Sequence, residues 1–149
     1  MGYLSKGYYT VCLSPAFSMI AFLVVTWLFW RTSFDWLTQI VLSTVTYISV
    51  IIVQMCGLIL CFVGYRKNES VSFNLILNIF LILWGSLVTL WAVGGYAMLL
   101  EWSSLSGVRS LTIWDHAEYA TSALRGLLEI ASGLVFTKLK NRTMNYEEQ

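Results

Sequence analysis

Charged residues divide this chain into long apolar stretches. Residues 7–30, 36–65 and 70–100 contain no Asp, Glu, Lys or Arg. An α-helix needs about 20 apolar residues to cross the roughly 30 Å hydrocarbon layer of a bilayer. Each stretch is therefore long enough for one membrane-spanning helix, and none is long enough for two helices joined by a turn.

A fourth stretch, residues 117–137, has the length of a span but is interrupted by charges. Glu118 can lie at the membrane surface, whereas Arg125 and Glu129 fall inside the span. Each of these two would cost about 2.5–3.5 kcal/mol if it entered the bilayer alone. Their i,i+4 spacing places them on one helix face, where they can form an ion pair. We therefore predict an intramembrane ion pair on a fourth span that packs against the other three instead of facing lipid.

These stretches predict an all-α fold, an integral membrane four-helix bundle in a single domain. We expect spans at about 12–30, 37–64, 72–99 and 117–137, followed by a short cytoplasmic tail at 138–149. Pro15 is expected to start the first regular helix, with residues 1–14 along the membrane surface.

The distribution of Lys and Arg predicts the orientation of the bundle. Four crossings put both termini on one side, and basic residues favour the cytoplasmic side of a membrane. Only Arg31 and Arg109 fall on the other side. Both termini are therefore predicted to be cytoplasmic, with the plasma membrane as the expected location. The basic residues on the predicted inner side are Lys6, Arg66, Lys67, Lys138, Lys140 and Arg142.

The composition excludes several classes of protein. The chain is 58% hydrophobic and 11% charged, whereas a soluble domain carries about 25% charged residues. Its 15% aromatic content and net charge of +1 are the opposite of a disordered profile. Nine basic residues are balanced by eight acidic ones and form no basic stripe, so we expect no nucleic-acid partner.

Uncharged polar residues inside the predicted spans have two interpretations. Tyr47 and Gln54 share a face of the second span, and Asn74 and Asn78 share a face of the third. Interhelical hydrogen bonds of this kind contribute about 0.6 kcal/mol each on average. The alternative is a polar conduit for a proton or ion, which needs several ionisable groups along a path. Because the spans offer only one neutralised pair, we favour packing and keep the conduit as the alternative.

Small residues repeat at the spacing that allows close helix packing. Two small residues four positions apart let the backbones of neighbouring membrane helices approach each other. The pattern predicts packing faces without identifying a partner. It occurs at Gly57-x3-Cys61, Gly85-x3-Thr89 and Ser122-x3-Gly126.

The second outer connection, roughly Glu101 to His116, is the only one of any size. Its second half offers Leu111, Ile113 and Trp114 as apolar residues. Exposed apolar residues of this kind indicate a partner surface or a dip into the membrane interface, and both interpretations stay open.

The cysteines offer no disulfide framework, because none lies in a predicted outer connection. Cys12 and Cys61 fall near the predicted cytoplasmic surface, where palmitoylation is one interpretation. The other, which we favour, is that they are small buried apolar residues.

Few residues carry the signs of catalysis. The one histidine, His116, lies near Asp115 and Glu118, and such a trio could bind a metal ion. Solvated loop residues explain the cluster better. The sequence has no Gly-rich phosphate loop and no nucleophile elbow. We therefore predict no enzyme, no cofactor and no metal site.

The predicted layout resembles the MARVEL-type four-pass proteins, and within them the Snakeskin type of insect smooth septate junctions. The resemblance covers the architecture of the whole chain. In residues it is carried by NLILNIFLILWGSLVTLWAVGGY (74–96) and ALRGLLEIASGLVF (123–136). Claudins and tetraspanins differ, because this chain lacks their long, cysteine-bearing outer loops.

The resemblance implies a protein that organises membranes and brings no catalytic residues with it. We expect a noncatalytic scaffold of a cell junction or membrane domain, acting through lateral helix packing and its second outer loop. The alternative is an auxiliary subunit of a channel or transporter complex. The expected partners are the lipid bilayer, other membrane proteins and further copies of this chain.

Overall fold

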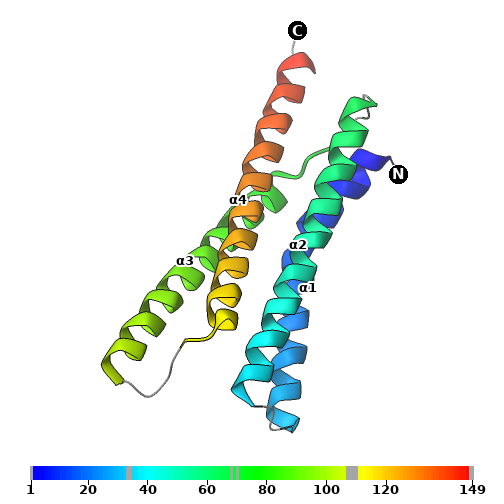
Figure 1. Cartoon of the computed structure of the whole chain (residues 1–149). Helices are drawn as coiled ribbons and strands as arrows, with labels where there is room; N and C mark the ends of the chain where they lie inside the picture. The colour runs from blue at the N-terminus through cyan, green and yellow to red at the C-terminus, as the bar shows by residue number, and fades with distance from the viewer. Residues whose placement is uncertain (1, 33–34, 68, 70, 107–110, 148–149) are drawn as a thin grey trace.

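The structure is a computed structural model that describes the chain apart from residues 1, 33–34, 68, 70, 107–110 and 148–149. The described residues form four α-helices and no strand, which confirms the predicted all-α fold. Successive helices run in opposite directions, so the two termini lie at the same end (Figure 1). The helices are α1 (Tyr3–Thr32), α2 (Trp36–Arg66), α3 (Leu75–Ser106) and α4 (Ile113–Glu147).

Three of the described helices, α1, α2 and α3, are long and apolar enough to cross a membrane. Their apolar ranges are Tyr3–Leu28, Trp36–Arg66 and Leu75–Ser104. The charged helix α4 is not among them. The chain is therefore an integral membrane protein built as an all-α bundle.

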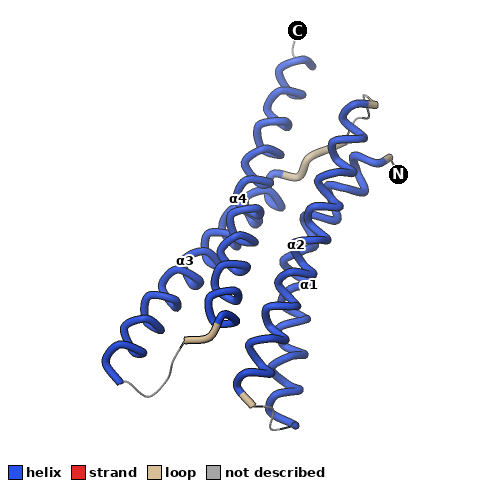
Figure 2. Tube along the Cα trace, viewed as in Figure 1, coloured by secondary structure: helices blue, strands red, loops and turns tan. Residues whose placement is uncertain are grey.

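Several helix boundaries differ from the prediction. Helix α1 begins at Tyr3, so residues 3–14 are part of the helix and not a separate surface segment. Helix α4 continues to Glu147 through most of the predicted tail. Helix α3 extends to Ser106 and α4 begins at Ile113, so the second outer connection shrinks to the interval 107–112, of which 107–110 lie outside the described residues. Figure 2 shows how little of the described chain is not helical.

Pro15 lies inside α1 without ending it. Proline has no backbone N–H, so it leaves the carbonyl four residues earlier, that of Val11, without its helical donor. The Ser14 hydroxyl donates a hydrogen bond of 2.8 Å to this Val11 carbonyl. A side chain of the neighbouring residue therefore satisfies the backbone group that the proline exposes, and the helix continues.

Polar side chains fix the N-termini of the other helices. Asp35 accepts a hydrogen bond of 3.1 Å from the Thr38 N–H at the start of α2. The hydroxyl and N–H of Thr38 lower the pKa of this exposed carboxyl. At the start of α4, the Thr112 N–H and hydroxyl donate to Asp115 at 2.8 and 2.7 Å. Such caps satisfy backbone donors that the first helical turn leaves free.

The bundle consists of two helical hairpins, α1 with α2 and α3 with α4, which are joined mainly where α2 packs on α4. Helices α1 and α3 make few contacts, and they diverge toward the lower end in Figure 1. Each hairpin is closely packed at the small residues expected from the sequence. A Cβ added at Gly57 would lie 3.1 Å from the Gly7 carbonyl oxygen. One added at Gly85 would lie 2.5 Å from the carbonyl oxygen of Gly126.

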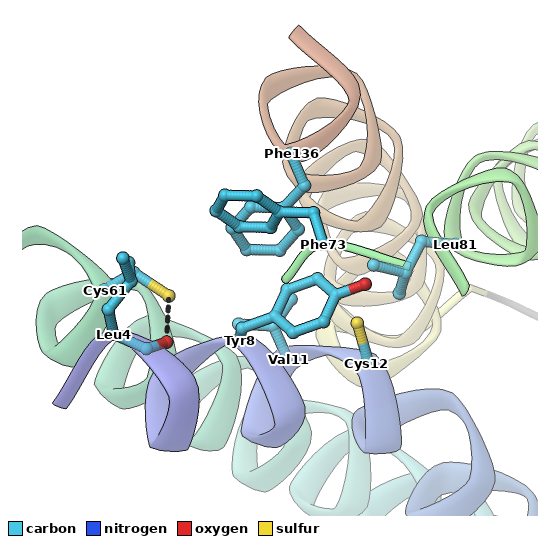
Figure 3. Close-up of a cluster of buried hydrophobic side chains, with 8 residues drawn as sticks. All are labelled: Leu4, Tyr8, Val11, Cys12, Cys61, Phe73, Leu81 and Phe136. Carbon is cyan, nitrogen blue, oxygen red and sulfur yellow. Dashed lines mark hydrogen bonds between the residues drawn. The ribbon is translucent and has the colours of Figure 1, made fainter. Parts of the chain in front are cut away.

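An aromatic cluster closes the end of the bundle that holds the termini. Tyr8 is fully buried, and its ring packs edge-on against Phe73 and Phe136 with centroids 5.2 and 5.0 Å away. Figure 3 shows these side chains with Cys12 and Leu81 beside them. The cluster draws α1, the start of α3 and the last third of α4 together, so the two hairpins are joined at this end.

Burial follows the pattern of a membrane protein. Large apolar side chains point outward, with Ile76 at 76% and Leu90 at 72% exposed. Many of the buried side chains are instead polar. In a bilayer the outward apolar residues contact lipid, and polar residues inside the bundle bond to each other across helices. The buried polar and charged residues of the spans include Ser14, Ser18, Ser43, Thr44, Gln54, Asn78, Ser122, Arg125, Glu129 and Ser132.

Candidate functional site

The ion pair predicted from i,i+4 spacing forms in the interior of the bundle. Arg125 Nε donates to Glu129 Oε1 at 3.2 Å. The two side chains are only 3% and 0% exposed. Because neither charge reaches solvent or lipid, each depends on the other for compensation.

Two further side chains extend the pair into a network across three helices. Gln54 Nε2 on α2 donates to Glu129 Oε1 at 3.1 Å and to Ser14 Oγ on α1 at 2.9 Å. The Ser14 hydroxyl in turn donates to the carbonyl that Pro15 leaves free. We call Ser14, Gln54, Arg125 and Glu129 the polar network. It connects the two hairpins through the hydrogen bond between Gln54 of α2 and Glu129 of α4.

Tyr47 also takes part, but through its ring. The Arg125 guanidinium carbon lies 5.9 Å from the centroid of the Tyr47 ring. A cation close to an aromatic ring is stabilised by the negative potential of the ring face. The sequence predicted a hydrogen bond for Tyr47, and the described contact is instead with a charge.

The two predicted asparagines have different roles. Asn78 is fully buried, and its Oδ1 accepts a hydrogen bond of 3.0 Å from the Tyr8 hydroxyl. Asn74 does not share a helical face with it, because α3 begins one residue later. The exposed side chain of Asn74 caps α3 by accepting from the Ile76 N–H at 2.9 Å, while its backbone N–H donates to Tyr8. The prediction that the Asn74 side chain packs inside the membrane is therefore wrong, because this side chain caps α3.

Six buried polar atoms of the described residues have no hydrogen-bond partner. Buried polar groups are nearly always paired, so each such atom needs an explanation. Three of them belong to residues that line one cavity, which is described below. The six atoms are Gln54 Oε1, Asn78 Nδ2, Trp84 Nε1, Ser122 Oγ, Arg125 Nη2 and Glu129 Oε2.

A partly open apolar cleft of about 520 Å³ lies between α1 and α3. Exposed apolar side chains such as Phe22 of α1 and Leu87 of α3 line its outer part. Its buried lining residues are polar, and they include Tyr47, Ser122 and Arg125. The cleft exists because the two hairpins are joined at one end and through α2 and α4, while α1 and α3 diverge.

The predicted partner-loop residues lie partly on a helix. Ile113 and Trp114 form the first turn of α4 and do not belong to a loop. Ile113 is 78% exposed, Trp114 is exposed, and Leu111 before the helix is half-buried. An apolar exposed surface therefore exists at this end, but it is presented by a helix.

Cys12 and Cys61, the lipidation candidates, are both buried. They belong to the core cluster around Tyr8, and Cys61 Sγ lies 3.8 Å from the Leu4 carbonyl oxygen (Figure 3). An acyl chain could be attached only after local opening of this core. The burial supports the packing interpretation of both residues.

The cluster around His116 is built into the start of α4. Asp115 caps that helix, and His116 Nδ1 lies 2.7 Å from the Tyr96 hydroxyl oxygen of α3. Asp115 and His116 therefore belong to a helix and not to a loop, whereas His116 is exposed as the sequence predicted. In the described part of the chain, no three His, Cys, Asp or Glu side chains are grouped so that they could hold a metal ion.

The sequence reasoning missed Ser14 and the interior role of Tyr8. Ser14 directly precedes the only proline of the chain, and a hydroxyl near a helical proline is placed to satisfy the carbonyl that the proline frees. Tyr8 resembles a surface aromatic residue in sequence, because its neighbour Tyr9 is also a tyrosine. Only the helix packing shows that Tyr8 points inward and Tyr9 outward.

No family model, no curated protein and no solved structure matches this chain. The class that the fold and the polar network define is an all-α integral membrane bundle with a paired charge in its interior. The resemblance to MARVEL-type proteins stays a prediction.

Replacing Ser14 with alanine tests the polar network. The variant removes one of the two acceptors of Gln54 and the donor to the Val11 carbonyl. We expect the free energy of unfolding to fall by about 1 kcal/mol, within the range for interhelical bonds in membranes. Ser49→Ala is the control, because Ser49 is exposed and bonds only within α2. Unfolding in mixed micelles, followed by circular dichroism, measures both. Equal losses in the two variants would show that the interhelical bond has no special weight.

Proposed function

We propose that this chain is a noncatalytic four-pass membrane protein that organises a cell junction or membrane domain. It acts through lateral packing of its helices and through the apolar surface at the start of α4. The proposal keeps the predicted orientation, with both termini in the cytoplasm of a cell and the plasma membrane as its location.

The observation that carries the proposal is the use of the interior polar groups. The polar network joins α1, α2 and α4, and Tyr8 joins α1 to Asn78 of α3. A conduit needs ionisable groups spaced along a path. Arg125 and Glu129 instead form an ion pair with each other, and Glu129 accepts a hydrogen bond from Gln54. This supports a structural role for the interior, which leaves the outward surfaces for interaction.

Four crossings are supported by the way α4 packs. Helix α4 lies along α3 and α2, and its charged pair is buried between the helices. A helix whose charges are paired in the bundle interior avoids most of the cost of placing them in lipid. At the opposite end from the termini, exposed tryptophans occur on all four helices, as in an aromatic belt at a membrane interface. They are Trp27 and Trp30 of α1, Trp36 of α2, Trp102 of α3 and Trp114 of α4.

Purification of the full chain in mild detergent after crosslinking in cells tests the proposal. We expect junctional membrane proteins to co-purify in fixed stoichiometry, and Ile113→Asn to reduce their recovery at least severalfold. Ile76→Asn is the matched control, because Ile76 is equally exposed but lies at the start of α3, at the other end.

Two results would contradict the proposal. Fixed stoichiometry with a channel or transporter would identify the chain as its auxiliary subunit. Proton or ion flux in liposomes that contain only this protein, abolished by Glu129→Gln, would show that the interior is a conduit.

A further inference from the structure

Residues that line the cleft between α1 and α3 carry hydrogen-bond donors that the protein leaves unused. Arg125 Nη2, Ser122 Oγ and Trp84 Nε1 are buried without partners, and all three residues line the cleft. Arg125 and Ser122 are 2% and 1% exposed, so their unused donors lie just behind the wall of the cleft. An unpaired buried donor is costly, and an acceptor in the cleft would remove that cost.

The rest of the cleft is suited to an apolar molecule. Phe22 and Leu23 of α1 face Leu87 and Val88 of α3 across it. Its volume of about 520 Å³ lies within the range of about 300–1,000 Å³ that is typical of ligand pockets. Apolar walls with a few polar groups at the inner side are the usual pattern of such pockets.

The depth and the charge of the site further limit which chemical groups a ligand can carry. Ser18, which lines the cleft, lies at the middle of the 30-residue helix α1. A phospholipid headgroup stays at the membrane surface, far from this depth. The charge of Arg125 is already balanced by Glu129. A carboxylate would therefore add an unbalanced negative charge inside the membrane, which is costly.

We propose that the cleft between α1 and α3 binds a neutral, membrane-soluble molecule with an apolar chain and a carbonyl or hydroxyl oxygen. Small rotations of side chains at the cleft wall bring the donor of Arg125, Ser122 or Trp84 to the oxygen, and the chain lies against the apolar residues of α1 and α3. The ligand enters laterally from the bilayer through the open side of the cleft.

Binding to the full chain in nanodiscs tests this inference with ligands of one chain length. The tritiated probes are methyl palmitate, which offers a carbonyl, hexadecanol, which offers a hydroxyl, ionised palmitate, and hexadecane, which has no oxygen. Binding to empty nanodiscs is subtracted. We expect methyl palmitate or hexadecanol to saturate at one molecule per chain, with hexadecane and palmitate at least about tenfold weaker.

Variants assign the binding to the cleft and to its donors. Ser122→Ala and Trp84→Phe should each weaken the neutral oxygen ligand roughly three- to tenfold, the usual effect of one hydrogen bond, and leave hexadecane unchanged. Val88→Trp fills the cleft and should abolish binding. Leu90→Trp is its matched control, because Leu90 lies on the same helix, is 72% exposed and does not line the cleft.

Four results would overturn the inference. Equal binding of hexadecane and the two oxygen ligands would show that the donors recognise nothing. Tighter binding of palmitate would show an anion site. Unchanged binding in Val88→Trp would place the ligand elsewhere. A dimer that Val88→Trp dissociates, without specific binding of any probe, would show that a second copy of the chain fills the cleft.

Discussion

Glu129→Leu is expected to lower the free energy of unfolding by about 3–5 kcal/mol, the cost of removing one partner from a buried ion pair. The variant leaves Arg125 only 2% exposed and without its countercharge. Gln54 also loses one of its two acceptors. Unfolding in mixed micelles by titration with a denaturing detergent, followed by circular dichroism, measures the loss.

The double variant Arg125→Met with Glu129→Leu is the control for this result. It removes both charges, so no uncompensated charge remains in the interior. Replacement of a buried ion pair by apolar residues is often neutral or stabilising, and we expect the double variant to be more stable than Glu129→Leu alone. A loss in the double variant that equals the sum of the losses in Glu129→Leu and in Arg125→Met alone would show that the charges do not interact.

Gly126→Leu should separate the helices of the second hairpin and destabilise the protein by about 3 kcal/mol or more. A Cβ at this position would lie 2.7 Å from the Gly85 carbonyl oxygen and 3.0 Å from the Thr89 backbone nitrogen. Both neighbours are backbone atoms, so the clash cannot be relieved by rotating a side chain. Inserting atoms into a packed interior costs about 1–3 kcal/mol and occasionally more.

Gly94→Leu is the matched control for this variant, because a Cβ at Gly94 has no other atom within 4 Å. The same substitution there is expected to change stability by less than about 1 kcal/mol, in the direction of higher helix propensity. Thermal unfolding in detergent compares the two variants. Equal losses at Gly94 and Gly126 would contradict the close approach of α3 and α4.

The apolar stretches predicted the fold class well because the physics of a membrane span is simple. Length and the absence of charge are sufficient to predict a crossing helix. Helix spacing also predicted the Arg125–Glu129 pair, since i,i+4 is a local property of one helix. The packing role of Gly57, Gly85 and Gly126 could also be predicted from the sequence, because helix contacts in membranes depend on small residues.

Features that depend on the packing of different helices were not predictable in the same way. The outward faces of membrane helices are as apolar as their inward faces, so the sequence does not indicate which residue of a helix points inward. The interior positions of Tyr8 and Ser14 are therefore evident only from the packing of α1 against α2 and α3 and from the contact of Tyr8 with Phe136 of α4. The cleft arises because α1 and α3 diverge. No local sequence pattern in either helix predicts this divergence.

The predictions of helix boundaries were wrong for a different reason. The polar pattern predicts Asn74 in the interior of a span, but asparagine also favours the N-cap position, where the structure places it. Pro15 predicts a helix start, because proline favours the first position of a helix. The hydroxyl of Ser14 satisfies the Val11 carbonyl that Pro15 leaves free, and it allows the helix to continue.

The central claim, that the charged helix α4 crosses the membrane inside the bundle, is tested most directly by labelling its two ends. In a chain whose three cysteines are replaced by alanine, single cysteines are placed at Ile113 and at Lys138, both of which are exposed. We predict that a membrane-impermeant maleimide labels Ile113→Cys in intact cells and labels Lys138→Cys only after the membrane is permeabilised. Labelling of both positions from the same side would contradict the claim.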